Sequence, residues 1–477
     1  MNIEGMLWLL GRARPGEDTW SSRAVKNIDR NIAALRDGKT YSNGDRYRRC
    51  VNDLNRALLA ASSGDARISL SDYEDRSLSP LRSSDLREAA DHPEDNPFYE
   101  YFSERLRGAM RDESPPFVGF SLTYLGQALT TFAMMGFVRA EYPSSKIILG
   151  GALVTSWMGN ASRSVRFDGL VDHVVAGPGE TFLLDLLGSE GERPIGATYD
   201  YGPFPRNDYL APGMIMPYST STGCYYGKCS FCPETAERNA YYQVGPRRAA
   251  EEIGRLVRET DPALVHLVDN AISPAVLKEL IRKPPGRPWY GFVRMTRELI
   301  DPHFCAQLKG SGCVMLKIGV ESGDEGVLNA MGKGINIADM SQGLEALSGA
   351  GIATYVYLLF GTPWESEASA GKTLDFVVGH APCIDFLNLA VFNLPHYSPD
   401  AAGLEQRPFY DGDLSFYTDF VHPAGWDRKK VRHFLDRVFI RHPAVREIVK
   451  RQPPCFTSNH AAFFCIQGSF NRRPGRV

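Results

Sequence analysis

Between residues 215 and 395, short apolar segments alternate with amphipathic segments, and this alternation constrains the fold more than any other feature of the chain. Parallel strands joined by helices form a barrel-like sheet, whose ligand site lies at the carboxyl ends of the strands. The expected strands are 216–221, 264–268, 289–293, 314–320, 354–360 and 386–392. Helices are expected at 249–259, 302–309, 337–349 and 368–378.

Three cysteines follow the first of these strands in the run Cys224-Tyr-Tyr-Gly-Lys-Cys229-Ser-Phe-Cys232. Thiolates are the usual ligands of [4Fe–4S] clusters, and three of them leave one iron open for a ligand. A zinc site normally needs four ligands at short spacing, and the next cysteine is Cys305. The pattern therefore favours a cluster, with zinc or free thiols as the alternatives.

The region before this barrel indicates a second α/β sheet. Strands are expected at 117–122, 146–151 and near 172–180, with a helix at 127–141. Glycines at the ends of these strands are typical of an open parallel sheet that binds ligands there. The polar first 115 residues predict helices near 22–36 and 46–61, a short strand near 66–70, and a first strand at the N-terminus.

The proposed domains are therefore 1–195, a linker at 196–214, a barrel at 215–395 and a C-terminal region at 396–477. Beyond 395 the strand pattern stops, and a helical tail that includes 427–450 is expected.

Composition excludes several classes of protein. The net charge of −3 gives no field that would recruit nucleic acid or an anionic membrane. No apolar run approaches the ~18 residues of a membrane span, and the N-terminus lacks the features of a signal peptide. Nine cysteines in 477 residues do not suggest a disulfide framework, so we expect a cytoplasmic protein.

Further motifs follow the cysteine loop in order along the barrel. They are Leu267-Val-Asp-Asn270, Gly291-Phe-Val-Arg294, Lys317-Ile-Gly-Val-Glu-Ser-Gly323, Val327-Leu-Asn-Ala-Met-Gly-Lys-Gly334 and Gly361-Thr-Pro-Trp-Glu-Ser366. Together with the cysteine loop, they make residues 116–395 resemble the radical S-adenosylmethionine (SAM) superfamily, in the branch with an N-terminal cobalamin-binding domain. The resemblance implies an α/β chain with a Rossmann-like cobalamin-type domain, a partial (β/α)6 barrel and a helical C-terminal region.

The resemblance also implies roles for individual residues. Cys224, Cys229 and Cys232 would bind the cluster, whose open iron would bind SAM. Phe231 and the backbone near Phe360 would contact adenine, Glu321 and Ser322 the ribose, and Asp269 and Arg294 would face the same site. The family's commonest spacing has three residues between the first two cysteines, and this chain has four. We expect Gly227 to absorb the extra residue with a positive φ.

Cobalamin contacts are implied less directly. The turns that contain Gly150, Gly151, Ala152, Gly177 and Gly179 resemble those of cobalamin domains, and Ser121, Thr123 and Tyr124 end the preceding strand. The D-x-H-x-x-G motif that supplies an axial histidine is absent before residue 200, and His92 and His173 lack its context. The domain would then bind cobalamin without a histidine from this chain, or bind nothing.

The expected function is cobalamin-dependent C-methylation of an unactivated carbon in a natural-product, small-molecule or peptide substrate, with a reductant such as flavodoxin or ferredoxin. Radical rearrangement, cyclisation or bond formation without methyl transfer is one alternative, and a non-catalytic iron–sulfur or cobalamin sensor is another. Among the remaining residues, His396 and Tyr397 are candidates for substrate contact, and Cys455 and Cys465 for radical acceptors. His266 is interpreted as a core residue.

Overall fold

The computed structural model describes residues 3–16, 18–62, 64–111, 115–159, 167–188, 199–204, 208–396, 398–409, 411–454 and 460–465. The chain divides into two compact units. Unit 1 comprises residues 1–33, 49–197 and 408–418, and unit 2 comprises residues 34–48, 198–407 and 419–477. Among the described residues, no helix has both the length and the apolar character that crossing a membrane requires.

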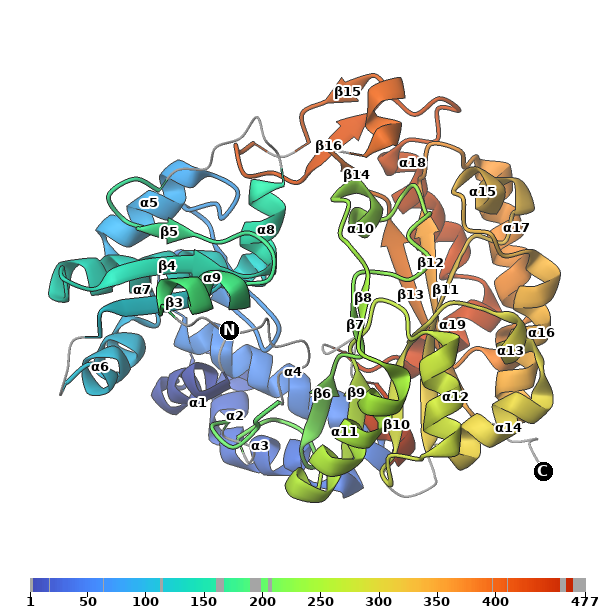
Figure 1. The fold of residues 1–477 in the computed structure, drawn as a ribbon, viewed down its shortest axis with the longest axis horizontal. Helices are drawn as coiled ribbons and strands as arrows, with labels where there is room; N and C mark the ends of the chain where they lie inside the picture. The colour runs from blue at the N-terminus through green and yellow to red at the C-terminus, as the bar shows by residue number, and fades with distance from the viewer. Residues whose placement is uncertain are drawn as a thin grey trace. The chain divides into compact units, whose positions relative to one another are not determined.

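A six-stranded parallel sheet in the order β13-β12-β11-β10-β9-β6 forms the centre of unit 2 (Figure 1). Its strands are β6 Ile215–Tyr218, β9 Leu264–Leu267, β10 Trp289–Val293, β11 Cys313–Glu321, β12 Ala353–Phe360 and β13 Phe386–Val391. All six strands were predicted from the sequence, and the structure confirms them to within a few residues at each end.

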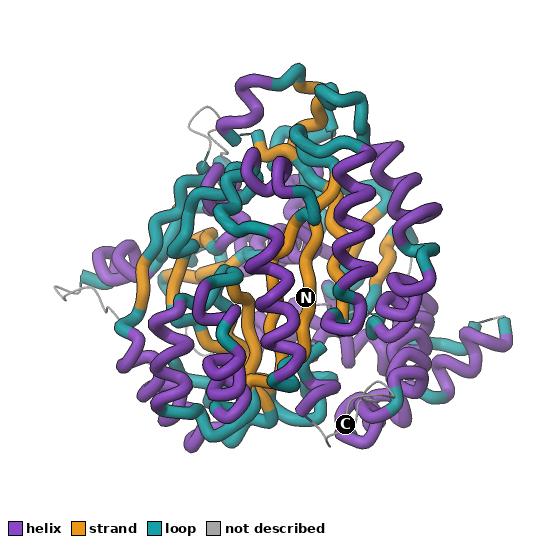
Figure 2. Tube along the Cα trace, turned by 90° about the vertical axis from the view of Figure 1, so that its right-hand side faces the viewer, coloured by secondary structure: helices purple, strands orange, loops and turns teal. Residues whose placement is uncertain are grey.

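Helices between and after the strands cover one face of the sheet, which we call the outer face (Figure 2). These helices are α11 Pro246–Thr260, α12 Pro274–Arg282, α13 Arg297–Ile300, α14 Pro302–Gly310, α15 Glu325–Ala330, α16 Ile337–Gly349, α17 Glu367–Gly379, α18 Arg428–Phe434 and α19 Pro443–Arg451. Alternate strand residues such as Leu316, Ile318 and Val320 point into this apolar layer. The intervening residues of β11 therefore lie on the opposite, inner face of the sheet.

The chain beyond residue 395 is not only helical, which corrects the sequence-based expectation. β14 Leu394–Pro395, β16 Tyr417–Phe420 and β15 Gln406–Arg407 form a small three-stranded sheet. These strands are only two to four residues long, too short to give a period-two pattern in the sequence. Helices α18 and α19 and the π-helical turn Leu435–Phe439 confirm the expected helical part.

Unit 1 contains a three-stranded parallel sheet in the order β3-β4-β5. The strands are β3 Phe117–Ser121, β4 Lys146–Gly150 and β5 His173–Val174, and a β1–β2 hairpin spans Ala66–Ile68 and Tyr73–Asp75. The helices are α1 Ile3–Arg12, α2 Thr19–Lys26, α3 Ile28–Arg36, α4 Gly44–Ala61, α5 Ser83–Asp91, α6 Tyr99–Ala109, α7 Ala128–Glu141, α8 Ala152–Met158 and α9 Glu180–Leu186. The last residues of α3 and the first residues of α4 belong to unit 2.

The N-terminal segment was expected to be a strand, and the structure shows the helix α1 instead. Met6, Leu9 and Leu10 are its buried apolar side chains. Their spacing of three and four residues places them on one face of a helix, whereas a strand would put neighbours on opposite faces. The apolar content of this segment was recognised in the sequence, but its period was not.

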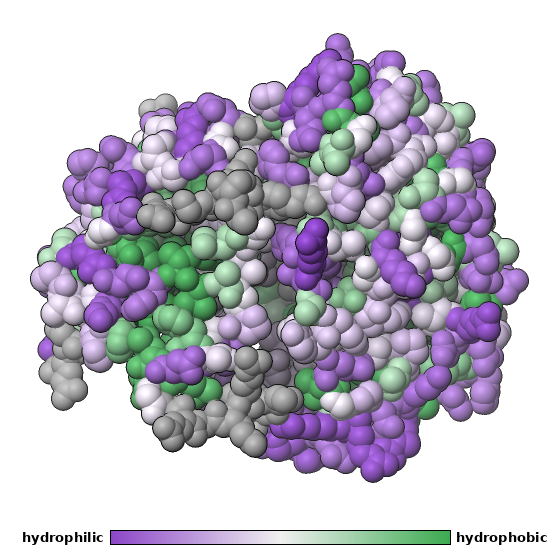
Figure 3. All heavy atoms as spheres, turned by 45° about the horizontal axis from the view of Figure 1, so that its top comes forward, coloured by the Kyte–Doolittle hydropathy of each residue, from purple (hydrophilic) through white to green (hydrophobic). Residues whose placement is uncertain are grey.

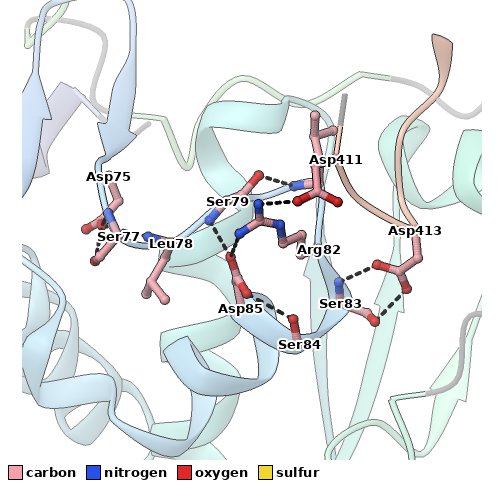
Figure 4. Close-up of polar contacts among 11 residues, drawn as sticks. Asp75, Ser77, Leu78, Ser79, Arg82, Ser83, Ser84, Asp85, Asp411 and Asp413 are labelled. Carbon is pink, nitrogen blue, oxygen red and sulfur yellow. Dashed lines mark hydrogen bonds and ion pairs between the residues drawn. The ribbon is translucent and has the colours of Figure 1, made fainter. Parts of the chain in front are cut away.

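Residues 408–418 return from the barrel half of the chain and complete unit 1 (Figure 4). The carboxylate of Asp413 accepts hydrogen bonds from the Ser83 backbone N–H at 2.8 Å and from the Ser83 hydroxyl at 2.6 Å. These bonds cap helix α5, whose preceding residue Arg82 provides no side-chain cap. Arg82 instead forms an ion pair with Asp411 at 2.7 Å. Helix α5 therefore depends on a segment more than 300 residues away in the sequence.

Candidate active site

The cysteine loop, residues 224–232, begins where the first barrel strand ends. Strand β7 Ser221–Thr222 leads into it, helix α10 Pro233–Ala236 follows it, and β8 Tyr242–Gln243 then pairs with β7 in a short hairpin. The three cysteines form no disulfide and are half-buried. Gly227 has φ 58°, which confirms the left-handed turn expected at the extra residue.

Asp269 supports the start of this loop. Its buried carboxylate accepts hydrogen bonds from the hydroxyls of Thr220 at 2.6 Å and Ser221 at 2.7 Å, and from the Thr220 backbone N–H at 3.1 Å. The sequence placed Asp269 at the end of the second barrel strand, and in the structure it lies two residues beyond the end of β9. That it faces a bound cofactor stays a prediction. Because three donors already occupy its carboxylate, Asp269 is a positioning residue for the cysteine loop.

A second loop, residues 331–334, lies against the cysteine loop, and we call it the glycine loop. The Ser230 N–H donates to the Met331 carbonyl at 3.0 Å, and the Tyr226 hydroxyl donates to the Gly332 carbonyl at 2.8 Å. Gly332 has φ 64°, and a Cβ there would lie 2.9 Å from the Lys228 carbonyl oxygen. Glycine therefore permits both the turn and the close approach of the two backbones.

Arg294, at the end of β10, joins the two loops. Its guanidinium lies 3.4 Å from the centre of the Tyr226 ring, and its Nη2 donates to the Gly334 carbonyl at 3.0 Å. A cation over an aromatic face is an attractive contact, so the arginine stabilises the position of Tyr226 in the cysteine loop. The sequence predicted Arg294 at this site but not the ring on which it stacks.

Glu321, the last residue of β11, forms a buried ion pair with Lys333 of the glycine loop at 2.7 Å. Its φ of 65° is unusual for a residue with a side chain and costs about 1–3 kcal/mol, so the surrounding contacts must impose it. Gly319 provides the room for the pair, because a Cβ there would lie 2.8 Å from Lys333 Nζ. The sequence predicted Glu321 and missed Lys333, although the glycines on either side of Lys333 were part of a recognised motif.

The charged groups act on the cysteines. Burial raises the pKa of Cys232 to about 11 and also raises that of Cys229. At Cys229 the nearby charges of Lys333 and Arg294 oppose this rise in pKa, and Glu321 adds to it. Thiols must lose their protons to bind metal, so two cations beside Cys229 suit an anionic cluster.

The donor set therefore fits a cluster held by three thiolates. In the part of the chain that the structure describes, no three His, Cys, Asp or Glu side chains are placed to hold a single metal ion. The assignment of these cysteines as cluster ligands consequently depends on their placement at the strand ends, their free thiols and the cations beside them.

Phe231, Ser322 and Phe360, which were also predicted to contact SAM, differ in what their side chains contact. The Phe231 ring is 5.5 Å from Lys333 Nζ and packs partly against the Phe392 cluster. Ser322 is fully buried, and its hydroxyl is bonded to Thr373 and to the Asp324 N–H. The Phe360 ring lies in the outer core, and its carbonyl accepts from the Phe392 N–H at 2.8 Å. The side chains of Ser322 and Phe360 thus serve the fold, which leaves backbone atoms for any cofactor contact.

In unit 1, the residues expected at the cobalamin surface gather at one edge of the three-stranded sheet. They end the strands or start the following helices: Ser121, Thr123, Tyr124, Gly150, Gly151, Ala152, Gly177 and Gly179. Gly151 has φ 107°, and a Cβ there would lie 2.6 Å from the Leu122 backbone nitrogen. Gly177 has φ 74° with open space around it. At the two positive-φ glycines, a strand end and the following turn thus meet without a side chain between them.

The two histidines of unit 1 are engaged elsewhere. The His173 ring packs against Phe182 in a tilted arrangement, with 5.4 Å between ring centres. His92 lies beside Glu88 and Glu94, at 3.7 and 3.8 Å. In unit 2, His396 follows β14 and is half-buried, whereas Tyr397 and Cys455 lie outside the described residues. Cys465 ends helix α20, Ala462–Cys465, with its thiol bonded to the Ala461 carbonyl.

Comparisons with known proteins agree with this geometry. Residues 218–377 match the family described as the Radical SAM superfamily. An anaerobic magnesium-protoporphyrin IX monomethyl ester cyclase of Rubrivivax gelatinosus is 22% identical over 249 residues, which cover 48% of this chain and 44% of the cyclase. The match therefore spans less than half the length of that relative.

Two solved structures match parts of this chain. The radical SAM methyltransferase TsrM from Kitasatospora setae, with cobalamin and a [4Fe–4S] cluster bound, is 19% identical with a TM-score of 0.50, over 69% of this chain and 75% of that one. The cobalamin-dependent radical SAM enzyme OxsB, with aqua-cobalamin bound, is 17% identical with a TM-score of 0.45, over 58% of this chain and 45% of that one.

Proposed function

We propose that the chain is a radical SAM enzyme and, more specifically, a cobalamin-dependent C-methyltransferase; its residues 218–377 match the Radical SAM superfamily. The observation that carries the radical SAM part is the convergence of the cysteine loop, Arg294 and the Glu321–Lys333 pair at the carboxyl ends of parallel strands. A [4Fe–4S] cluster and SAM, when bound, supply the radical chemistry by which this superfamily removes hydrogen from a substrate.

The residues of unit 2 would hold and orient these groups. Cys224, Cys229 and Cys232 would bind the cluster. Lys333 occupies one carboxylate oxygen of Glu321, and the other accepts no hydrogen bond from the described residues, so it is available to a ribose hydroxyl. The fixed position of such an acceptor is what orients a cofactor against its substrate.

The methyl-transfer part depends on unit 1. Its strand ends offer backbone and small side chains. Exposed apolar residues belong to the same unit: Tyr124 is 69% exposed, and Leu183 of α9 and Leu187, which follows this helix, are 45% and 70% exposed. Apolar residues gather on the part of the face in Figure 3 that belongs to unit 1 (green). A large flat ligand such as a corrin could cover this surface, and cobalamin would then supply the methyl group. The fold of TsrM, which binds cobalamin, supports the same assignment.

Product stoichiometry tests this proposal. One SAM, after accepting an electron from a reductant such as flavodoxin or ferredoxin and a hydrogen atom from substrate, becomes methionine and 5′-deoxyadenosine. A second SAM gives up its methyl group and becomes S-adenosylhomocysteine. Protein purified anaerobically with iron, sulfide and cobalamin should contain corrinoid and one cluster, and should release both nucleoside products. If the protein contained no corrinoid and released 5′-deoxyadenosine without S-adenosylhomocysteine, the result would instead support rearrangement or cyclisation. The similarity to a cyclase also favours that alternative.

Two variants test the residue assignments. Cys229→Ala should fold but lose its iron and all 5′-deoxyadenosine formation, whereas Cys383→Ala, another half-buried free cysteine, should retain both. Glu321→Ala should weaken SAM binding and leave the iron content unchanged. Iron retained by Cys229→Ala, or SAM affinity unaltered by Glu321→Ala, would refute the corresponding role.

A further inference from the structure

The inner face of the barrel sheet holds a second buried lysine, Lys317, on the same strand as Glu321. Its side chain is 7% exposed, and its Nζ lies 3.1 Å from His266 Nε2 and 5.4 Å from the centre of the Tyr290 ring. His266 stacks on Tyr290 with 4.2 Å between ring centres. The sequence interpretation of His266 as a core residue is therefore incomplete, since this histidine is half-buried and contacts the lysine.

Among the described residues, Lys317 has no anionic partner. In the described part of the chain, no carboxylate lies within ion-pair distance of its Nζ, whereas Lys333 on the same side is paired with Glu321 at 2.7 Å. Buried lysines are rare unless they are paired, because an isolated buried charge is costly. Burial lowers the pKa of Lys317 to about 8, which leaves the ammonium form in the majority at neutral pH. Burial and the charge of Lys317 lower the pKa of His266 to about 3, so this neighbour is a neutral acceptor.

Inner-face residues toward the carboxyl ends of the strands are partly exposed. On β12, Tyr357 and Leu359 are half-buried, while Val356, Leu358 and Phe360, which point outward, are fully buried. Phe292, the β10 residue paired with Lys317, is also half-buried. The inner face between Lys317 and the strand ends is thus accessible and aromatic.

Toward the amino ends, the same face is closed. Met315, Ala353 and Phe386 are buried in one apolar cluster with Ala461, next to α20. Lys317 lies at the boundary between the closed and the accessible parts. It is four residues below Glu321 on β11, which corresponds to roughly 13 Å along an extended strand.

We propose that Lys317 binds the anionic group of the enzyme's substrate, an organic acid whose carboxylate or phosphate reaches Lys317 and whose apolar body lies along Phe292 and Tyr357. This inference rests on the proposed function only in taking the bound acid to be the substrate of the radical chemistry. The depth of Lys317 implies that the anionic group lies at the end of the substrate remote from Glu321. His266 would be a positioning residue that orients the ammonium group.

The test measures the binding of three small probes to full-length protein carrying its cluster. Benzoate and phenyl phosphate present the two candidate anions on a similar apolar body, and benzamide is a neutral control. Titration calorimetry should detect at least one anion bound in preference to benzamide. The variants Lys317→Met and Lys317→Gln should lose roughly ten- to a hundredfold in affinity for that anion. Lys278→Met, which alters an exposed lysine on the outer helix α12, should bind as the wild type does.

Each outcome decides a point. A preference for benzoate identifies a carboxylate, and a preference for phenyl phosphate identifies a phosphate. Equal affinity in the wild type and both Lys317 variants, or no anion binding to the wild type, overturns the inference. Release of 5′-deoxyadenosine by the wild type is measured in the same preparation. If this product forms without anion binding, the lysine site is refuted and the radical function stands. If anion binding depends on Lys317 but this product does not form, the lysine site stands and the radical function is refuted.

Discussion

The two sheets of this protein end their strands in opposite ways. In unit 2 the carboxyl ends carry buried charges, namely Asp269, Glu321 and its partner Lys333, each held by specific bonds. In unit 1 the corresponding ends carry glycines, hydroxyls and exposed apolar residues, with backbones in close contact at Gly151. The difference suits unit 2 to polar ligands held by fixed charges, and unit 1 to a ligand held by shape and by backbone groups.

The largest expected effect concerns the charged edge. Lys333→Met leaves the Glu321 carboxylate buried without its partner, and we expect it to lower the stability of unit 2 by about 3–5 kcal/mol. Chemical denaturation followed by tryptophan fluorescence measures this change. The double variant Lys333→Met/Glu321→Gln should recover most of the loss, because no buried charge then remains. Lys372→Met, which removes an exposed lysine paired with Asp324, is the control and should cost less than about 1 kcal/mol. Equal losses of stability in Lys333→Met and Lys372→Met would show that the buried ion pair of unit 2 contributes no more than an exposed one.

A pH titration sharpens the comparison. Burial raises the pKa of Glu365, in the turn after β12, to about 7, although the Gly361 N–H and Trp426 Nε1–H both donate to it. Because the folded pKa exceeds the unfolded value of 4.5, the stability from this group is complete below pH 4.5 and is lost as pH rises through 7. The loss is roughly 3 kcal/mol. Thermal melts between pH 5 and 8 should show this slope, and Glu365→Gln should flatten it. An unchanged slope in the variant would assign the effect to other groups.

Glycine substitutions probe the other edge. Gly151→Ala meets the Leu122 backbone and must adopt φ 107°, so we expect a loss of about 1–3 kcal/mol and a loss of corrinoid binding. The added methyl group of Gly177→Ala meets open space, so this variant loses stability only because alanine must adopt a left-handed conformation. We expect that loss to be about 1–2 kcal/mol at most. Melting temperature and bound corrinoid are measured for both variants. If the two lose corrinoid equally while remaining folded, close backbone packing is not the feature that matters.

The smallest effect is expected at the returning segment of unit 1. Asp413→Ala removes the cap of α5 and should cost about 0.5–2 kcal/mol. Asp411→Ala breaks only an ion pair in which the aspartate side chain is 89% exposed, and should be neutral. Limited proteolysis at residues 408–418 distinguishes the variants, since only the first should become more sensitive. If Asp411→Ala became as sensitive to proteolysis as Asp413→Ala, the ion pair with Arg82 would be what holds residues 408–418 in place.

The sequence by itself determined the six barrel strands, the order of the motifs and the cysteine loop, because buried parallel strands and glycine turns leave local patterns. It also indicated the positive φ of Gly227. Tertiary structure alone decided what depends on residues distant in the chain. Lys333 reaches Glu321, Asp413 caps α5, and the hydroxyls of Thr220 and Ser221 occupy Asp269. Lys317 belongs to a recognised motif, yet only the folded inner face shows that no carboxylate of the described residues pairs with it. A buried charge has no signature in sequence, because burial is set by the whole fold, not by neighbours along the chain.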